Sequence, residues 1–547
     1  MNDDKNPKDL DTIEKELRKK YIFLCLATVP FFIGCLAYLQ FYPDDYLDAA
    51  YFALRNYIME YDFEEKSFLL ELSRWSALLA STTLILSVFQ ELYALFQRNY
   101  IPRFQKNVVV FYGDKGETEA IIKKMKKTND GKSVPCFWAQ RGVREKNVSH
   151  HIIMYDDIQE NLAFYGKYQK TFSPHSHIHL MLEGISPHFL DHKSKSLYPF
   201  SYQELLAQDF WINQGQKVKA LCEEKNGVVK IFFLGDGFLL EKLLDYGLQV
   251  NIFNENQRIE YHLFGDFTQY EAFHHGLEKI DHVHYREYKT YPAELTSRFV
   301  GANGNHYPDD RLFFYKDEWY FHKEELKTAD LFVICGKNDN ETLTLASQLK
   351  TAFPLAVIPL EKTNGTDKEE FISVPLYLRL NDKDLLHEDT ATTQNFVSFG
   401  DKDTIFTYEN ITNNKLIQLA IKINAYYWNA LPKKENQLWH SLLSFDRDSS
   451  LLAALFLLSK KQELLSSNSD SLKPYCELEH IRWMRFHFMY NWTIMDKAVP
   501  TKGNENPPSK NKVSREHPLL IPYEQLKTKG KENLQQMLEA MLLNMKE

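Results

Sequence analysis

The stretch VVKIFFLGDGFLLEKLLDYGLQVNIFNENQ, residues 228–257, decides the fold class of this chain. It contains an apolar strand, a glycine turn, a helix with apolar residues at helical spacing, and a second strand. Strand, turn, helix and strand in this order form the repeating unit of a parallel α/β sheet. The free N–H groups at the start of the helix would face a phosphate, and an acid about 20 residues after the first glycine would bind a ribose. The stretch therefore predicts nucleotide contacts at Gly235, Asp236, Gly237 and Glu255.

The same alternation continues on both sides of this stretch. Residues 107–127, NVVVFYGDKGETEAIIKKMKK, give a strand, a turn and a helix, and more short strands follow them. Because this turn lacks the G-x-G-x-x-G spacing of a dinucleotide-binding loop, we expect the unit to serve as scaffolding. Residues 330–350, DLFVICGKNDNETLTLASQLK, repeat the pattern on the C-terminal side. Ligands of open sheets bind beyond the carboxyl ends of the strands, so Gly336, Asn338 and Asp339 join the candidate contacts.

Two apolar stretches near the N-terminus predict a transmembrane α-hairpin. Residues 21–43 carry no charge and are long enough to cross ~30 Å of hydrocarbon, and residues 75–96 are interrupted only by Glu91. Lys and Arg residues precede the first stretch and follow the second, whereas the loop between them is acidic. The positive-inside rule then places both termini in the cytoplasm. The alternatives are a cleaved signal peptide for the first stretch and a buried soluble helix for the second.

Composition and motifs exclude several classes of protein. The mean hydropathy of −0.43 excludes a polytopic membrane bundle, and the net charge of −9 argues against a nucleic-acid polymer as partner. The loop between the apolar stretches contains no glycine, which excludes a potassium filter of the TVGYG type. The six cysteines form no CxxC pair, so neither a zinc ribbon nor a disulfide framework is indicated. We predict no catalytic and no metal-binding residues.

The C-terminal region reads as mainly α-helical and concentrates flat aromatic and basic side chains. In one predicted helix, Glu479, Arg482, Trp483 and His487 fall near the same side at helical spacing. Such a set can stack a nucleobase and hold phosphates, whereas the alternative is that the tryptophans belong to the core between helices. The candidate ligand contacts of this region are Trp439, Arg447, Glu479, Arg482, Trp483, Trp492, His517 and Tyr523.

These residues also carry a resemblance to a known family. The segments EHIRW (479–483) and HPLLIPYEQL (517–526), with Trp492 between them, look like the RyR domain, the repeat first described in ryanodine receptors. Asn491 stands where that family has a glycine. Bacterial RyR domains occur on chains with two membrane helices and Rossmann units of the TrkA-N or RCK type. The resemblance implies a membrane protein that responds to a nucleotide-derived signal in antiphage defence.

The expected organisation follows from these patterns. It consists of an N-terminal transmembrane α-hairpin, tandem α/β Rossmann-like units of the TrkA-N/RCK type, and a C-terminal, mostly α-helical RyR domain. The expected boundaries are 1–106 for the hairpin, 107–215 and 216–370 for the Rossmann-like units, 371–436 for a linker and helix, and 437–547 for the RyR domain.

Three functions remain open from the sequence. The first is a membrane effector that a nucleotide, or a cyclic or linear oligonucleotide signal, gates to permeabilise the membrane. It would lie in the bacterial inner membrane, contact lipid, keep most of its chain in the cytoplasm and form a homo-oligomer such as a tetramer, because one hairpin cannot form a pore. The second is a non-conducting sensor subunit of an ion transporter. The third is an NAD-dependent enzyme, which we favour least because Leu240 replaces the third glycine of the fingerprint.

Overall fold

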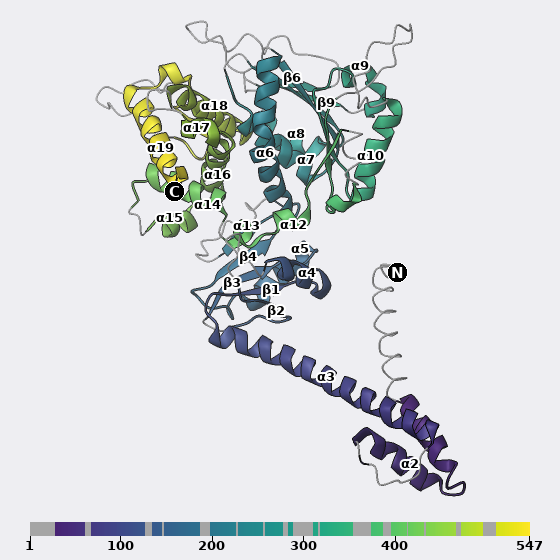
Figure 1. The fold of residues 1–547 in the computed structure, drawn as a ribbon. Helices are drawn as coiled ribbons and strands as arrows, with labels where there is room; N and C mark the ends of the chain where they lie inside the picture. Colours follow the sequence, from purple (N-terminus) through teal and green to yellow (C-terminus); the bar gives the residue numbers. More distant parts are fainter. Residues whose placement is uncertain are drawn as a thin grey trace, which may run out of the picture. The chain divides into compact units, whose positions relative to one another are not determined.

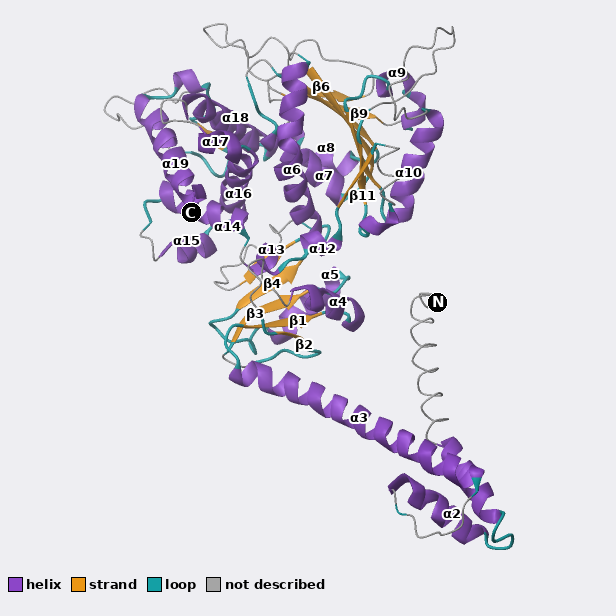
Figure 2. Cartoon of the chain, in the orientation of Figure 1, coloured by secondary structure: helices purple, strands orange, loops and turns teal. Residues whose placement is uncertain are grey.

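The structure is a computed structural model, and the chain divides into two compact units, residues 1–104 and 105–547, which are described separately (Figure 1). Helices and strands are distinguished by colour in Figure 2. The described residues are 28–58, 60, 67–125, 134–144, 147–185, 197–225, 228–254, 257–276, 283–287, 310–315, 318–353, 374–386, 395–412, 414–430, 434–466, 472–495 and 510–546.

The first unit consists of helices around a small core. Its elements are a helical segment at 28–39, α2 (Tyr46–Arg55), η1 (Asn56–Ile58) and α3 (Phe68–Phe104). Ser73 joins them, because its hydroxyl donates to the Pro30 carbonyl at 2.8 Å and accepts from the Asn56 amide at 3.1 Å. Large apolar side chains such as Leu47 and Leu79 remain exposed, which is typical of an interaction surface.

The expected transmembrane hairpin is wrong for the residues that the structure describes. None of their helices combines the length and the apolar character that a membrane crossing requires. The helix α3 has 37 residues, which is long enough at ~1.5 Å per residue, but it includes Glu71, Arg74 and Glu91. The described part of the first apolar stretch begins at residue 28, and residues 21–27 lie outside the described chain.

The second unit begins with a five-stranded parallel sheet. Its strand order is β2-β1-β3-β4-β5, so the chain crosses from one side of β1 to the other between β2 and β3. The carboxyl ends of β1 and β3 are therefore the topological switch point of the sheet. The strands are β1 (Val108–Tyr112), β2 (Cys136–Trp138), β3 (Val148–Ile153), β4 (His177–Met181) and β5 (Leu197–Phe200). The helices are α4 (Lys115–Met125), α5 (Ile158–Tyr168) and α6 (Tyr202–Glu224).

A seven-stranded parallel sheet follows, in the order β12-β11-β10-β6-β7-β9-β8. Its switch point lies between β6 and β10. The prediction of tandem parallel α/β units is thereby confirmed. The strands are β6 (Val228–Gly235), β7 (Arg258–Phe264), β8 (Val283–Glu287), β9 (Asp310–Tyr315), β10 (Leu331–Cys335), β11 (Leu376–Arg379) and β12 (Phe396–Phe399). The helices are α7 (Phe238–Val250), α8 (Thr268–Phe273), η5 (Trp319–Phe321), α9 (Lys323–Leu326), α10 (Asp339–Ala352), η6 (Lys383–Leu385) and α12 (Lys402–Ile405).

The remainder of the second unit is helical apart from one pair of short strands. Two strands of the second sheet, β11 and β12, fall in the range 371–436 that was expected to be a linker and a helix. The elements are α13 (Tyr408–Thr412), α14 (Lys415–Tyr427), α15 (Glu435–Ser441), α16 (Ser444–Ser459), α17 (Lys461–Ser466), α18 (Lys473–Met489), β13 (Thr493–Ile494), β14 (Glu516–His517), η9 (Tyr523–Gln525) and α19 (Thr528–Lys546).

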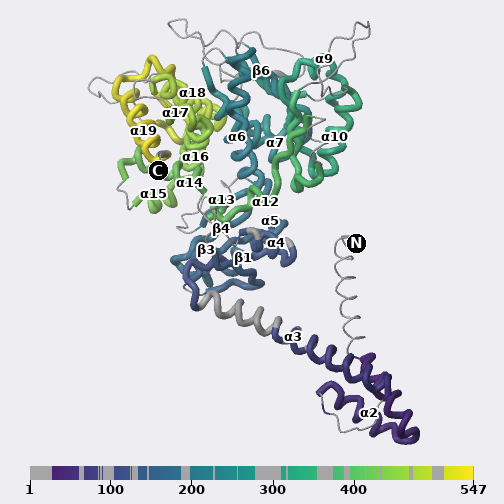
Figure 3. The backbone as a smooth tube through the Cα atoms, in the orientation of Figure 1, coloured from purple at the N-terminus to yellow at the C-terminus, as the bar shows by residue number. Residues whose placement is uncertain are grey.

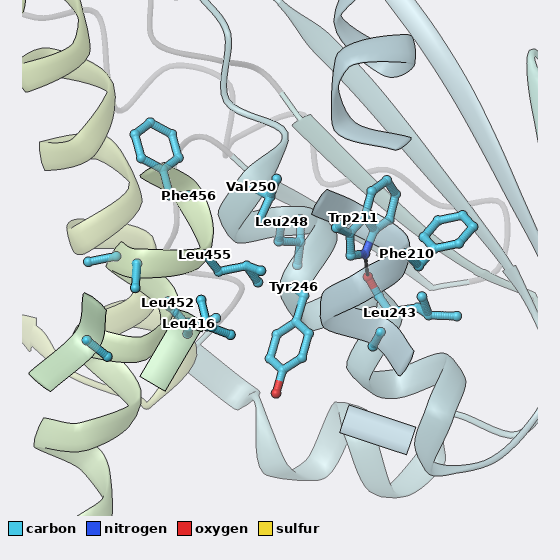
Figure 4. Packing of buried hydrophobic residues seen from close by; sticks show 14 of the residues in the cluster. Phe210, Trp211, Leu243, Tyr246, Leu248, Val250, Leu416, Leu452, Leu455 and Phe456 are labelled. Carbon is cyan, nitrogen blue, oxygen red and sulfur yellow. Dashed lines mark hydrogen bonds between the residues drawn. The ribbon is translucent and has the colours of Figure 1, made fainter. Parts of the chain in front are cut away.

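One continuous hydrophobic core links the two sheets to the helices. The helices α6 and α7 lie between the second sheet and the C-terminal helices, as the tube in Figure 3 shows. On one side of this layer, Trp211 of α6 is fully buried and its indole N–H donates to the Leu243 carbonyl of α7 at 2.7 Å (Figure 4). On the other side, Leu248 and Val250 of α7 face Leu455 of α16 (Figure 4). The helix α7 is thus fixed to both α6 and the helical region.

Candidate functional site

The predicted glycine turn after β6 lies at the switch point of the second sheet. Gly235 and Gly237 have φ angles of +122° and +97°. A Cβ atom on Gly235 would lie 2.0 Å from the Cys335 carbonyl oxygen, whereas one on Gly237 would meet open space. Asp236 forms a long ion pair with Lys337 at 3.9 Å. Gly235 thus allows close strand packing, and the predicted ribose ligand, Glu255, lies outside the described residues.

Gly336, Asn338 and Asp339, the three candidates at the turn after β10, stabilise the local backbone. Asn338 caps α10 by accepting from the Glu341 N–H at 2.9 Å. The Asp339 carboxylate accepts from the backbone and side-chain N–H groups of Asn381 at 3.0 and 2.9 Å. A Cβ atom on Gly336 would lie 2.5 Å from the Thr342 backbone nitrogen. The local geometry therefore gives all three residues structural roles.

Four other candidates surround one cavity of about 400 Å³ among the C-terminal helices. We call it the helical-domain pocket. Its size falls within the ~300–1,000 Å³ range of small-molecule sites. The predicted residues that line it are Glu479, Arg482, Trp483 and His517, and the other polar or aromatic residues used below are Asn424, Trp428, Asp446, His480, His487 and Lys510.

The Arg482 guanidinium in this pocket is already neutralised. Its Nε and Nη2 donate to the two carboxylate oxygens of Glu479 at 2.7 and 2.9 Å. Its Nη1 donates to the Gln249 side chain at 3.2 Å. Arg482 is only 1% exposed and Glu479 3%. A buried bidentate pair of this kind fixes the pocket wall and leaves little positive charge for a phosphate.

Trp483 carries the aromatic surface of the pocket. It is half-buried, and its ring lies 4.1 Å from the His487 ring and 4.9 Å from the His517 ring between centroids. The His480 ring also stacks on the Trp483 ring, with 5.7 Å between the ring centroids and 17° between the ring planes. A partly open indole framed by imidazoles offers a flat ligand a stacking surface.

The three histidines are held in their neutral forms. Burial lowers the pKa of His480 and of His517 to about 4, and lowers that of His487 well below its ordinary value. His480 Nε2 lies 2.7 Å from the Ile521 carbonyl and His487 Nδ1 lies 2.9 Å from the Trp483 carbonyl, so both nitrogens carry protons. The opposite nitrogen of each ring is therefore an acceptor.

Two candidates from the predicted set lie behind the pocket wall. Trp492 is 5% exposed and stacks on Phe445 at 5.4 Å. Tyr523 is equally buried, and burial raises its pKa to about 12. Asn491, which replaces the family glycine, adopts a φ of +63°, and its side-chain oxygen accepts from the Gly276 N–H at 2.8 Å. Asparagine tolerates this left-handed conformation, so the turn before Trp492 forms without a glycine.

Trp439 and Arg447 line a different cavity. This cavity, of about 130 Å³, lies between α6, α7 and the helices α15, α16 and α18. Lys242 of α7 contributes to it and pairs with Asp245 at 3.5 Å. Of the eight predicted residues of the C-terminal region, four therefore line the helical-domain pocket, two line this cavity, and Trp492 and Tyr523 line neither.

Sequence reasoning missed Asn424 of α14. The residue is 4% exposed, and no described residue donates to its side-chain oxygen. Its amide nitrogen reaches only the Ser450 hydroxyl, at 3.4 Å. A buried amide oxygen without a donor is costly unless a ligand supplies one. The only sequence signal was an Asn within an otherwise apolar helix face.

Arg482 of the pocket wall and two further basic residues, Arg485 and Lys460, bind the C-terminal end of α7. Arg482 donates to Gln249, Arg485 donates to the Leu248 carbonyl at 2.9 Å, and Lys460 donates to the Val250 carbonyl at 2.9 Å. Cationic groups at a helix C-terminus are favourable for its dipole. The same helix begins at the Gly237 turn, so it connects the helical-domain pocket to the switch point of the second sheet.

Among the described residues, no group of three or more His, Cys, Asp or Glu side chains could hold a metal ion. The site therefore offers stacking surface, neutral acceptors and paired charges. Comparison with protein-family models, with curated proteins and with solved structures found no match for this chain.

Proposed function

We propose that the chain is a sensor of a nucleotide-type ligand, which binds through its base in the helical-domain pocket. The observation that supports this most is that the half-buried Trp483 lines a cavity of about 400 Å³. Stacking of a base on an aromatic side chain contributes about 1–3 kcal/mol. The RyR resemblance of the same residues, still a prediction, implies a ligand of the same class.

The polar groups of the pocket favour a base over a phosphate. Arg482 is paired, and the histidines are neutral because burial lowers their pKa values. The orphan oxygen of Asn424 can accept an exocyclic N–H group of a base. Lys510, which is about a third exposed, lies 4.0 Å from Asp446 and provides a partly paired cation for a phosphate.

The helix α7 gives the sensor a route by which binding can be reported. A ligand shifts a conformational equilibrium only by its difference in affinity for the two states. Arg482 contacts the ligand pocket on one side and Gln249 of α7 on the other. Ligand binding that moves α18 would therefore change the contacts that hold α7 to the helical region.

This proposal keeps the second hypothesis from the sequence, a non-conducting sensor, and does not include a membrane hairpin. The ligand class, a homo-oligomeric state and a transporter as partner remain predictions. Purification of the tagged full-length chain from its native host would test the last two. The sensor-subunit hypothesis predicts a defined oligomer that carries a second protein, whereas a monomer without a stable partner would contradict it.

Calorimetric titration of the full-length chain with adenosine, AMP and cyclic di-AMP tests the binding proposal. We expect at least one of these to bind, and Trp483→Ala to weaken that binding about 10-fold or more because the stacking surface is lost. Trp75→Ala, which changes a 65% exposed tryptophan of the first unit, serves as the control and should leave affinity unchanged. Binding that is equally strong in Trp483→Ala would refute the proposed site.

A further inference from the structure

A third cavity, of about 180 Å³, lies where the first sheet meets the second. We call it the junction pocket. Its walls come from the carboxyl ends of β1, β3 and β4, from the start of α6, and from the end of β11. The residues that carry the argument are Asp114, Thr118, Asp156, Gln203, Arg379 and Lys402.

The junction pocket occupies the switch point of the first sheet. Asp114 follows β1, and Asp156 follows β3, its neighbour on the far side of the crossover. Ligands of doubly wound sheets bind in the crevice that this crossover creates. The structure thus places a cavity at the point where topology alone favours a ligand, although the sequence predicted only a scaffold there.

Arg379 is the buried cation of this cavity. The residue is 9% exposed, and its Nη2 donates to the Asn381 side chain at 2.9 Å. Its Nε and Nη1 are buried and have no hydrogen-bond acceptor among the described residues. The Asp339 carboxylate lies 3.7 Å from Nη1, beyond hydrogen-bonding distance, and is already occupied by Asn381. Two guanidinium donors therefore lack an acceptor.

Two neutral groups on the opposite wall are also unsatisfied. Thr118 of α4 is 1% exposed, and its hydroxyl has no hydrogen-bond partner among the described residues. The side-chain oxygen of Gln203 is likewise buried without a donor. Most buried polar atoms in folded proteins have a partner, so three such groups around one cavity can form hydrogen bonds with a polar ligand.

The charges define what kind of ligand would fit. The Glu183 carboxylate lies near enough to Arg379 for the two charges to interact, but its hydrogen bonds go to the start of α6, where it accepts from the Tyr202 N–H and from the Ser201 hydroxyl at 3.1 Å. Arg379 and Lys402 can bind an anionic group of a ligand. Gln203 and the exposed Asp156 can accept hydrogen bonds from donors such as hydroxyl groups. The cavity is smaller than the ~300 Å³ of a typical drug-sized site, which limits the bound part to a small metabolite.

We propose that the junction pocket binds a phosphorylated sugar, with its phosphate on Arg379 and Thr118 and its hydroxyl groups on Gln203 and Asp156. The guanidinium fork matches phosphate geometry, and the threonine hydroxyl adds a neutral donor. The sugar phosphate can be a free metabolite or the ribose phosphate of a nucleotide. This site is separate from the helical-domain pocket and does not depend on the proposed function.

The test is calorimetric titration of the full-length chain with ribose 5-phosphate, AMP, ribose and inorganic phosphate. We expect ribose 5-phosphate to bind and ribose not to bind. Arg379→Met should weaken this binding about 10- to 100-fold and Thr118→Val about 3- to 10-fold, with circular dichroism confirming that both variants fold. Lys383→Gln, a neighbouring cation that is 58% exposed and pairs with Asp401, is the matched control and should have no effect.

The outcomes distinguish a free sugar phosphate from a nucleotide as the ligand, and they distinguish binding at the junction pocket from binding at the helical-domain pocket. Binding of ribose 5-phosphate without AMP supports a free sugar phosphate, and Arg379-dependent binding of both supports a site that also accepts nucleotides. Trp483→Ala should leave ribose 5-phosphate affinity unchanged, so failure of one site does not imply failure of the other. The proposal is overturned if no sugar phosphate binds, if inorganic phosphate alone binds, or if affinity is unchanged in both Arg379→Met and Thr118→Val.

Discussion

The helical-domain pocket and the junction pocket differ in how their polar groups are satisfied. In the helical-domain pocket the buried charges are paired, as Arg482 is with Glu479, and the histidines are neutral. In the junction pocket Arg379 and Thr118 leave buried donors without acceptors. Paired charges build a rigid wall for an aromatic ligand, whereas unpaired donors mark where an anion is missing. The sequence motif thus indicated a stacking site with paired charges, whereas unsatisfied hydrogen-bond donors indicated an anion site that the motif did not include.

The largest effect should come from the ion pair beneath the helical-domain pocket. Arg485 and Asp310 are both 0% exposed, and Arg485 Nη2 lies 2.6 Å from the Asp310 carboxylate. Arg485→Ala would leave Asp310 buried and unpaired, at a cost of about 3–5 kcal/mol. Chemical denaturation of the full-length chain measures this. A loss no larger than that of the exposed-site control Lys383→Gln would contradict the view that α18 is fixed by buried charge.

The substitution Glu479→Gln would leave the helical-domain pocket with an unpaired arginine, as the junction pocket has in Arg379. Glu479→Gln leaves Arg482 without its carboxylate, which should cost about 1.5–3 kcal/mol of stability. Because the guanidinium then keeps its charge unpaired, the ratio of AMP to adenosine affinity should rise above that of the wild type. Calorimetry with the two ligands measures this ratio. An unchanged ratio would show that Arg482 is not charge-neutralised by Glu479 alone.

The histidines of the helical-domain pocket predict a pH dependence. Burial lowers the pKa of His480 and His517 to about 4 from the ordinary value of 6.5. Between these values the unfolded chain binds more protons than the folded chain, so stability should rise as pH increases from about 4 to 6.5 and fall in the reverse direction. His517→Asn should have a shallower slope than the wild type in this window. Equal slopes in denaturation experiments at several pH values would contradict the assignment.

The smallest effect should come from Thr118 in the junction pocket. Valine has nearly the same shape and removes a buried hydroxyl that lacks a partner. Without ligand, Thr118→Val should therefore stabilise the chain by about 1 kcal/mol, a rise in Tm of about 2 °C. Differential scanning fluorimetry measures this shift. A lower Tm than the wild type would mean that the hydroxyl already has a partner, and would weaken the contrast between the pockets.

Local patterns in the sequence predicted much of the second unit. The apolar strands at 108–112 and 228–235, the glycine turn and the helical character of the C-terminal region all appear in the structure. These features depend on periodicity over a few residues, which a sequence displays directly. Three of the predicted ligand contacts, Glu479, Arg482 and Trp483, line one cavity for the same reason, and His517 joins them from β14.

What the sequence could not predict depends on long-range packing. Arg379 lies at the end of β11, in a range expected to be a linker and a helix, and lines the same cavity as Thr118 only because the two sheets meet. Asn338 and Asp339 are polar residues at a turn, and only the structure shows that their side chains hold the backbone. The hairpin prediction relied on apolar runs, and among the described residues no helix combines the length and the apolar character of a membrane crossing.

The most direct test of the central claim is an experimental structure of the full-length chain with AMP. We expect the base to stack on the Trp483 ring at about 3.5–4 Å and to form hydrogen bonds within the helical-domain pocket, with an N–H group facing the Asn424 oxygen. We also expect the Glu479–Arg482 pair to stay intact. A base bound at the Gly235–Gly237 turn, with the helical-domain pocket empty, would contradict the account.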